Sequence, residues 1–415
     1  MAPKSYTDYT TAQSVRNPCL RDLCQFLEVK FTRNIGRFVC VDIPCSDEAL
    51  IIRELSIDGV KNLLDDRSTN IPSTKGRILI VEDLSSEIVE LLGSRLDIDP
   101  VFFASHLHGQ RVELNYPKPS LARLPSRVRK QNFVSLPYQR CLEFCNASPS
   151  LRRLSRDCNI PRKVMMLPPT KDVQIGLVQH CCSVLWAGIE EGPWLGIISV
   201  DPPTNNIYRS IDTEVALQTR LFQGGYEDFT NRASFFSHDQ AGPSRHSLLQ
   251  DLIHYWTAAL PPSFTNTPAS LLTLSYYPLQ IIAAEWVRYI AVLSHNIKQY
   301  EYTYDPLVAN VTTPSGLNYL DANLRNLQVW GRRCIQKLYK LDLVTNFLRN
   351  HTPSAAGNVE FKEYELLAED YVHIRSQVQT YQHRLEALIP VVTSLVQIVD
   401  TRRSLKEAAN VTRLT

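Results

Sequence analysis

Residues 361–415 read FKEYELLAEDYVHIRSQVQTYQHRLEALIPVVTSLVQIVDTRRSLKEAANVTRLT. Apolar and aromatic side chains recur through this segment with spacings of three and four residues in strict alternation. They lie at Tyr364, Leu367, Tyr371, Ile374, Val378, Tyr381, Leu385, Leu388, Val392, Leu395 and Val399. A repeat of 3.5 residues keeps one face of a long helix against a partner helix. We call these eleven residues the seam, and at 1.5 Å per residue the helix that carries it is about 80 Å long. Because that length exceeds the width of a compact domain, we expect a stalk.

The middle of this helix has a broader apolar surface than the seam alone. Residues 387–399 contain no charged side chain, which predicts that several neighbours pack there. Pro390 lies within this stretch and removes one backbone donor, so we expect a kink near residues 387–389 but no break. The register ends after Val399, because Arg402 and Lys406 occupy the next seam positions.

The preceding third of the chain also has helical patterns. Helices are predicted over residues 246–260, over 268–302 with a bend at Pro278, and over 317–350. Only a short turn separates the last of these from the stalk, so the stalk should run antiparallel to it.

The first half of the chain mixes strand and helix signals. Residues 37–43 and 77–82 are predicted strands, and the second is a continuous apolar run typical of a central strand. It leads into a helix with Ser85 as its N-cap, and Asp99 followed by Pro100 begins a second helix.

Further strand signals follow. Residues 132–136 form a strand candidate, and residues 173–186 and 194–201 flank a turn and predict a hairpin. Residues 205–245 are polar and irregular. We therefore predict an α+β fold with two domains. An α/β/α layered domain occupies residues 1–245, and an all-helical hairpin occupies residues 246–415 and ends in the long stalk helix 361–415.

Composition describes an ordinary globular chain. It has 415 residues, 44% of them hydrophobic and 21% charged, with a net charge of +2. The ten cysteines form no CxxC pair, which favours buried, reduced thiols in a cytosolic protein. The N-terminus resembles no signal peptide, and no window approaches the roughly 18 apolar residues that span a membrane. We expect a cytoplasmic location for the chain as it stands.

Positive charge gathers in one segment. Between Lys118 and Lys163, eleven lysines and arginines accompany only two acidic residues, Glu143 and Asp157. Few aromatic residues are interleaved and no stacking motif is present, so we interpret the segment as a solvated loop flank and expect no nucleic-acid partner.

No catalytic motif is evident. GxxxxGK[ST], GxSxG, HExxH and GxGxxG are all absent, and we predict that the chain is not an enzyme. His106 and His108 are two residues apart on a predicted helix, so they point to different faces and are interpreted as surface or capping residues. Four acidic residues open the stalk and suit its helix dipole, with a hard-cation site as the alternative: Glu363, Glu365, Glu369 and Asp370.

Four segments resemble one known family. RILIVEDLS (77–85), LDIDPVFFASHLHG (96–109), EWVRYI (285–290) and the C-terminal VDTRRSLKEAANVTRLT (399–415) are similar to parts of CorA-type magnesium channels, especially divergent members from filamentous fungi. The order of an α/β domain, two helices and one very long helix is similar too. The resemblance implies a cytosolic regulatory and assembly domain at the cytoplasmic face of a membrane, regulated by Mg²⁺ or another divalent cation.

The same resemblance implies a homo-oligomer, a pentamer in the family, around the stalk. Val411 and Leu414 match apolar residues near the inner end of the pore. The family's Gly-Met-Asn signature is absent, so we expect this chain to lack the pore segment and to reach the membrane only through a transmembrane part that it does not contain. The alternative is a soluble scaffold whose stalk binds other helical partners.

Overall fold

The computed structural model describes residues 5–29, 36–45, 49–65, 74–108, 124–145, 153–168, 174–187, 194–204, 207–210, 213–229, 242–262, 264, 269–308, 314–352 and 361–414. The chain divides into two compact units. The first unit comprises residues 1–285 and 350–367, and the second comprises residues 286–349 and 368–415. The domain boundary predicted at residue 245 remains a prediction.

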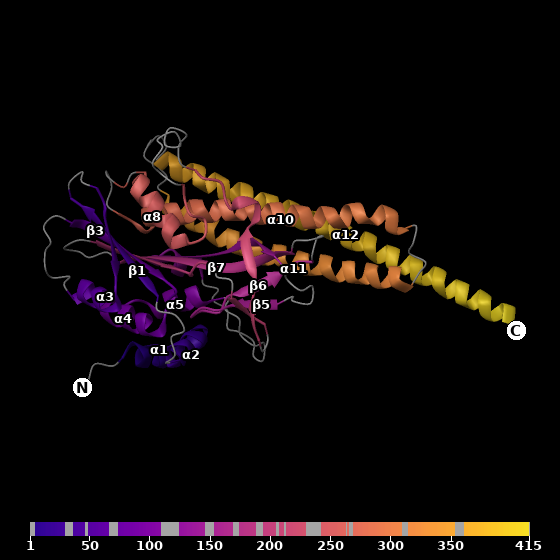
Figure 1. Cartoon of the computed structure of the whole chain (residues 1–415), viewed down its shortest axis with the longest axis horizontal. Coiled ribbons are helices and arrows are strands. Elements are labelled where there is room, and N and C mark those ends of the chain that lie inside the picture. Colours follow the sequence, from indigo (N-terminus) through magenta and orange to yellow (C-terminus); the bar gives the residue numbers. More distant parts are fainter. Residues whose placement is uncertain are drawn as a thin grey trace. The chain divides into compact units, whose positions relative to one another are not determined.

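A mixed sheet of eleven strands forms the centre of the first unit (Figure 1). Its main path runs in the order β10-β9-β5-β6-β7-β8-β3-β1-β2, with β4 paired to β7 and β11 paired to β4. The strands are β1 (Arg37–Pro44), β2 (Ile51–Leu55), β3 (Thr74–Glu82), β4 (Phe133–Cys145), β5 (Arg153–Arg156), β6 (Lys163–Met166), β7 (Gln174–Ala187), β8 (Trp194–Val200), β9 (Ile207–Arg209), β10 (Glu214–Ala216) and β11 (Gln218–Leu221).

The central strand predicted over residues 77–82 is confirmed. β3 pairs with β1 on one side and with β8 on the other, and the β3–β8 pair is parallel whereas the other pairs are antiparallel. Ile78, Leu79, Ile80 and Val81 are all fully buried, as expected for a strand covered on both faces. The predicted hairpin is also confirmed, because β7 and β8 pair antiparallel with Cys182 opposite Val200. Residues 205–245, predicted to be irregular, contribute the short strands β9, β10 and β11.

Helices cover both faces of this sheet. α5 packs on β4 and β7, while α8 packs on β3 and α9 on β7. Figure 1 shows α1–α5 on one side of the sheet and α8 on the other, so the predicted α/β/α layering is confirmed. The helices are α1 (Tyr6–Ser14), α2 (Arg21–Glu28), α3 (Ile57–Asp65), α4 (Ser86–Leu96), α5 (Pro100–Leu107), α6 (Pro125–Val128), α8 (Leu248–Ala258) and α9 (Leu271–Leu274), with 3-10 turns η1 (Pro18–Leu20) and η3 (Phe222–Gly224).

The predicted helix starts are confirmed by their caps. The Ser85 hydroxyl accepts a hydrogen bond from the backbone N–H of Ile88 at the start of α4. Asp99 accepts one from the N–H of Val101, and Pro100 occupies the first position of α5. Such caps satisfy backbone donors that have no partner within the helix.

Two interpretations of polar residues were wrong. His106 is fully buried and therefore has no surface role, although His108 is exposed and caps the end of α5. In the basic segment, Arg127, Arg129 and Lys130 are exposed, as expected for a solvated flank. Arg140, Arg156 and Arg162, however, are fully buried on or beside strands, so the interpretation is wrong for these three arginines. Charge counted along the sequence could not separate these arginines from exposed ones, because the ion partners of Arg140 and Arg162 lie far away in the chain.

Three long helices supply the second unit: α10 (Tyr276–Val308), α11 (Pro314–His351) and α12 (Lys362–Leu414). The bend predicted at Pro278 is instead a helix boundary, since α9 ends at Leu274 and α10 begins at Tyr276, which places Pro278 in its first turn. α12 continues through Pro390 without a break, as predicted. Within the second unit α11 and α12 run antiparallel (Figure 1), and Asp342 of α11 pairs with Arg375 of α12.

Candidate functional site

The start of α12 is anchored in the first unit. The Tyr364 hydroxyl donates a hydrogen bond of 2.9 Å to the backbone carbonyl of Pro262, and its ring meets that of Tyr276 edge-on at 5.2 Å between centroids. Tyr364 and Leu367, the first two seam residues, are both buried. This end of α12 is therefore held by aromatic packing and a hydrogen bond within the first unit.

Seam residues of the second unit pack inside their own chain. Five of them are buried: Tyr371, Ile374, Val378, Leu385 and Val392. Polar pairs flank them, with Arg375 joined to Asp342 of α11 and Arg384 lying 3.7 Å from Glu301 of α10. This part of the seam is occupied by intramolecular helix packing and is not open to another molecule.

The rest of the seam is less covered. Tyr381, Leu388, Leu395 and Val399 are half-buried. Val411 and Leu414, the residues matched to the inner end of a pore, lie on the last turns of α12, but their side chains are outside the described residues.

A second apolar line runs along the same helix and is open. Val391 is 53% exposed, Ile398 48% and Leu405 66%. These residues are seven apart, so they lie on one face of α12. We call them the exposed stripe. Within the second unit, α12 continues past the adjacent ends of α10 and α11 (Figure 1).

The sequence contains a partial signal for this exposed stripe. The uncharged stretch 387–399 predicted an apolar surface wider than one seam, and the stripe lies one position before the seam residues Val392 and Val399. Whether the seam or the exposed stripe is buried depends on how far α10 and α11 extend along α12. The sequence of α12 alone does not specify this, because it is set by the tertiary structure.

Asp201 is a buried polar residue of the first unit that is held by several hydrogen bonds. Its carboxylate accepts two hydrogen bonds of 2.8 Å from the Arg162 guanidinium and another of 2.8 Å from the backbone N–H of Cys181. Burial disfavours the charged carboxylate, but the attraction of Arg162 outweighs this and holds the pKa of Asp201 below its usual value.

His106 joins this group to a serine. Its Nε2 lies 3.6 Å from Asp201 Oδ1, and its Nδ1 lies 2.9 Å from the Ser183 hydroxyl. Burial and the nearby Arg162 charge lower the pKa of His106 to about 4, so the ring is neutral at pH 7.

The order Ser183–His106–Asp201 resembles that of a hydrolase triad, but all three residues are buried. A substrate cannot reach the hydroxyl, and Asp201 is already neutralised by Arg162. The group is an internal support that ties α5 to β7 and to the end of β8.

A second buried group of charges lies around Arg140 of β4. Its guanidinium lies 3.0 Å from Glu285 and 3.5 Å from Asp251, and it donates a 2.8 Å hydrogen bond to the backbone carbonyl of His246. These contacts join β4 to α8 and to the start of α10 within the first unit.

The described residues contain neither a metal-ligand cluster nor a membrane-spanning helix. No group of three or more His, Cys, Asp and Glu side chains in that part of the chain is arranged to hold a metal ion. No helix in the described ranges combines the length and apolar character needed to cross a bilayer.

Comparisons with known proteins give distant structural matches. The structure of the complete CorA magnesium transporter from Methanocaldococcus jannaschii matches with a TM-score of 0.39 and 13% identity, covering 91% of this chain and 82% of the transporter chain. The soluble domain of CorA from the same organism matches with a TM-score of 0.35 and 12% identity, covering 86% of this chain and 97% of the domain. No family model and no curated protein matches the sequence.

Proposed function

We propose that this chain is an assembly domain in which the exposed stripe of α12 packs against α12 helices of further copies. The observation that carries this proposal is the exposure of Val391, Ile398 and Leu405 on one helix face. Burying a half-exposed aliphatic side chain stabilises an assembly by roughly 1 kcal/mol, so the stripe contributes about 3 kcal/mol per chain. The half-buried Leu388 and Leu395 lie beside it and add to the apolar area.

The role proposed for the assembly is that of the cytosolic regulatory part of a CorA-like channel for Mg²⁺ or another divalent cation, with five copies around the stalk. The pore would belong to a transmembrane part outside this chain. Glu369 and Asp370 are exposed neighbours on α12, and partial burial together with the Glu369 charge raises the pKa of Asp370. A divalent cation that reduces repulsion among such carboxylates of adjacent copies would favour the closed ring.

The proposal is tested by the mass of the purified chain, measured by light scattering after size-exclusion chromatography. We expect an oligomer, and we expect Ile398→Asp to shift it toward the monomer because a charge is then buried at the contact. Gln397→Asp is the matched control, since it adds the same charge one residue away and about 100° around the helix. Leu388→Asp should weaken the oligomer as well.

Two results would contradict the proposal in different ways. If the wild-type chain is monomeric at every concentration, the proposed self-assembly is wrong. If the oligomer has the same mass in chelator and in millimolar Mg²⁺, the proposed assembly stands but the proposed regulation by Mg²⁺ is wrong.

The exposed stripe also favours a second candidate function, that of a scaffold that binds a different helical protein. A scaffold is monomeric when pure, and its mass does not change in Ile398→Asp. The same light-scattering measurement therefore separates the two functions.

A further inference from the structure

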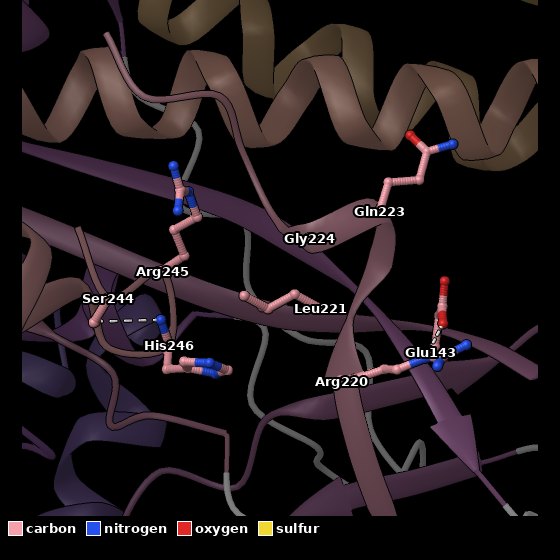
Figure 2. A pocket seen from close by; sticks show the side chains of 8 residues that line it. All are labelled: Glu143, Arg220, Leu221, Gln223, Gly224, Ser244, Arg245 and His246. Carbon is pink, nitrogen blue, oxygen red and sulfur yellow. Dashed lines mark hydrogen bonds and ion pairs between the residues drawn. The ribbon is translucent and has the colours of Figure 1, made fainter. Parts of the chain in front are cut away.

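A pocket of about 570 Å³, lined by charged and polar residues together with Leu221 and Gly224, opens on the first unit (Figure 2). Figure 2 shows Ser244, Arg245 and His246 on one side and Glu143, Arg220 and Gln223 on the other, with Leu221 between them. The two sides come from the segment before α8 and from the β4–β11 pair with η3, so distant parts of the sequence form one site. Its volume is in the range typical of pockets for small molecules.

Buried charges hold one wall in place. Asp251, which is fully buried, accepts hydrogen bonds from the backbone N–H of Arg245 at 2.8 Å and from the Ser244 hydroxyl at 3.0 Å. Arg140, also fully buried, donates to the His246 carbonyl at 2.8 Å. The segment 244–246 is therefore fixed by two interior side chains that the proposed assembly does not use.

Arg245 is oriented by further contacts. Its Nε donates a 2.8 Å hydrogen bond to the Tyr226 carbonyl, and its guanidinium lies 5.8 Å from the centre of the Tyr226 ring. Its backbone has φ +59°, a left-handed conformation that costs free energy for a residue with a side chain. Among the described residues, no acceptor contacts its two terminal nitrogens.

The other cation in the pocket is already paired. Arg220 forms an ion pair with Glu143, so its charge is largely neutralised. His246 is exposed, and its ring has no hydrogen-bond partner in the part of the chain that the structure describes. Arg245 and His246 thus provide donors whose natural partner is an oxyanion.

We infer that this pocket binds a small molecule that carries phosphate or carboxylate groups, with Arg245 and His246 as its donors. The pocket is larger than a single oxyanion, and the Arg220–Glu143 pair and Gln223 on the opposite side contact the remainder of the ligand. This inference is independent of the assembly proposed for α12, because the pocket lies in the first unit and the exposed stripe in the second.

Isothermal titration of the full chain with inorganic phosphate, glycerol 3-phosphate and citrate tests the inference and separates the two anion types. We expect saturable binding of at least one probe in the millimolar range or tighter. Arg245→Gln and His246→Gln should each weaken it by about tenfold, since each removes one charge-assisted or neutral hydrogen bond. Glu143→Gln should strengthen binding, because it removes a negative charge from the pocket wall and releases Arg220 to the ligand.

Arg325→Gln is the matched control. Arg325 is an exposed arginine of α11 in an ion pair with Asp321, so its loss should leave anion binding unchanged. His246 is exposed, so His246→Gln is informative even where Arg245→Gln lowers stability. The inference is overturned by the absence of saturable binding for all three probes, or by equal affinity in the wild type, Arg245→Gln and His246→Gln. The oligomeric mass should not change in these variants, which distinguishes a failure here from a failure of the assembly.

Discussion

Asp201→Asn should destabilise the first unit strongly, because it leaves the Arg162 guanidinium buried without its charge partner. Both side chains of this ion pair are only 2% exposed. Removing one member of such a pair typically costs 3–5 kcal/mol, so we expect a loss of about 4 kcal/mol.

The expected shift in Tm follows from the size of the unit, which contains about 300 residues. At about 2.1 cal/mol/K per residue, its unfolding entropy is roughly 0.6 kcal/mol/K. A loss of about 4 kcal/mol therefore lowers the Tm by about 6–7 °C.

Differential scanning calorimetry of the full chain provides the assay. Asp58→Asn is the matched control, because Asp58 pairs with Lys61 on an exposed helix face and should cost less than about 0.5 kcal/mol. The double variant Arg162→Met, Asp201→Leu should recover part of the loss, since it removes the uncompensated charge. An Asp201→Asn shift no larger than that of Asp58→Asn would refute the reasoning.

The remaining predictions concern pH and helix packing. The pKa of His106 is lowered to about 4 in the folded chain, whereas an unfolded histidine titrates near 6.5. The free energy of unfolding should therefore be at its full value above about pH 6.5. It should fall by about 3 kcal/mol as the pH is lowered to about 4, because the unfolded chain takes up a proton that the folded chain does not. His106→Asn should flatten Tm against pH in that range, and an unchanged slope would contradict this. Leu385→Ala, at a fully buried site, should cost about 2–5 kcal/mol, whereas Leu405→Ala on the exposed stripe should change stability by less than about 0.5 kcal/mol. Urea unfolding measures both, and equal losses would count against the packing described here.

The sequence predicted elements well where the physical cause is local. The N-caps at Ser85 and Asp99 require only a side-chain oxygen next to a helix start, and both occur. The long helix over 362–414 follows from a repeat that can be counted by eye. The α1 helix was not anticipated, because its face is too polar to show a pattern, although Tyr6 packs into the core and Glu90 accepts from its backbone N–H.

Charged residues show the opposite case. His106 and Arg162 are ordinary polar residues in the sequence, yet both are buried because Asp201, far away along the chain, lies at the end of β8 beside them. A linear count of charge cannot reveal such a partner. The pocket around Arg245 was missed for the same reason, since the wall opposite Arg245 forms only where β11 pairs with β4.

By itself, the sequence determined the order of the elements, the length of α12 and the existence of a broad apolar surface near its end, because periodicity and capping act between residues a few positions apart. Only the tertiary structure decided which apolar line of α12 is buried, which arginines are interior and where a pocket forms. These depend on contacts between residues far apart in the chain, and no local pattern specifies how far α10 and α11 extend along α12 or which strand carries the partner of a charge.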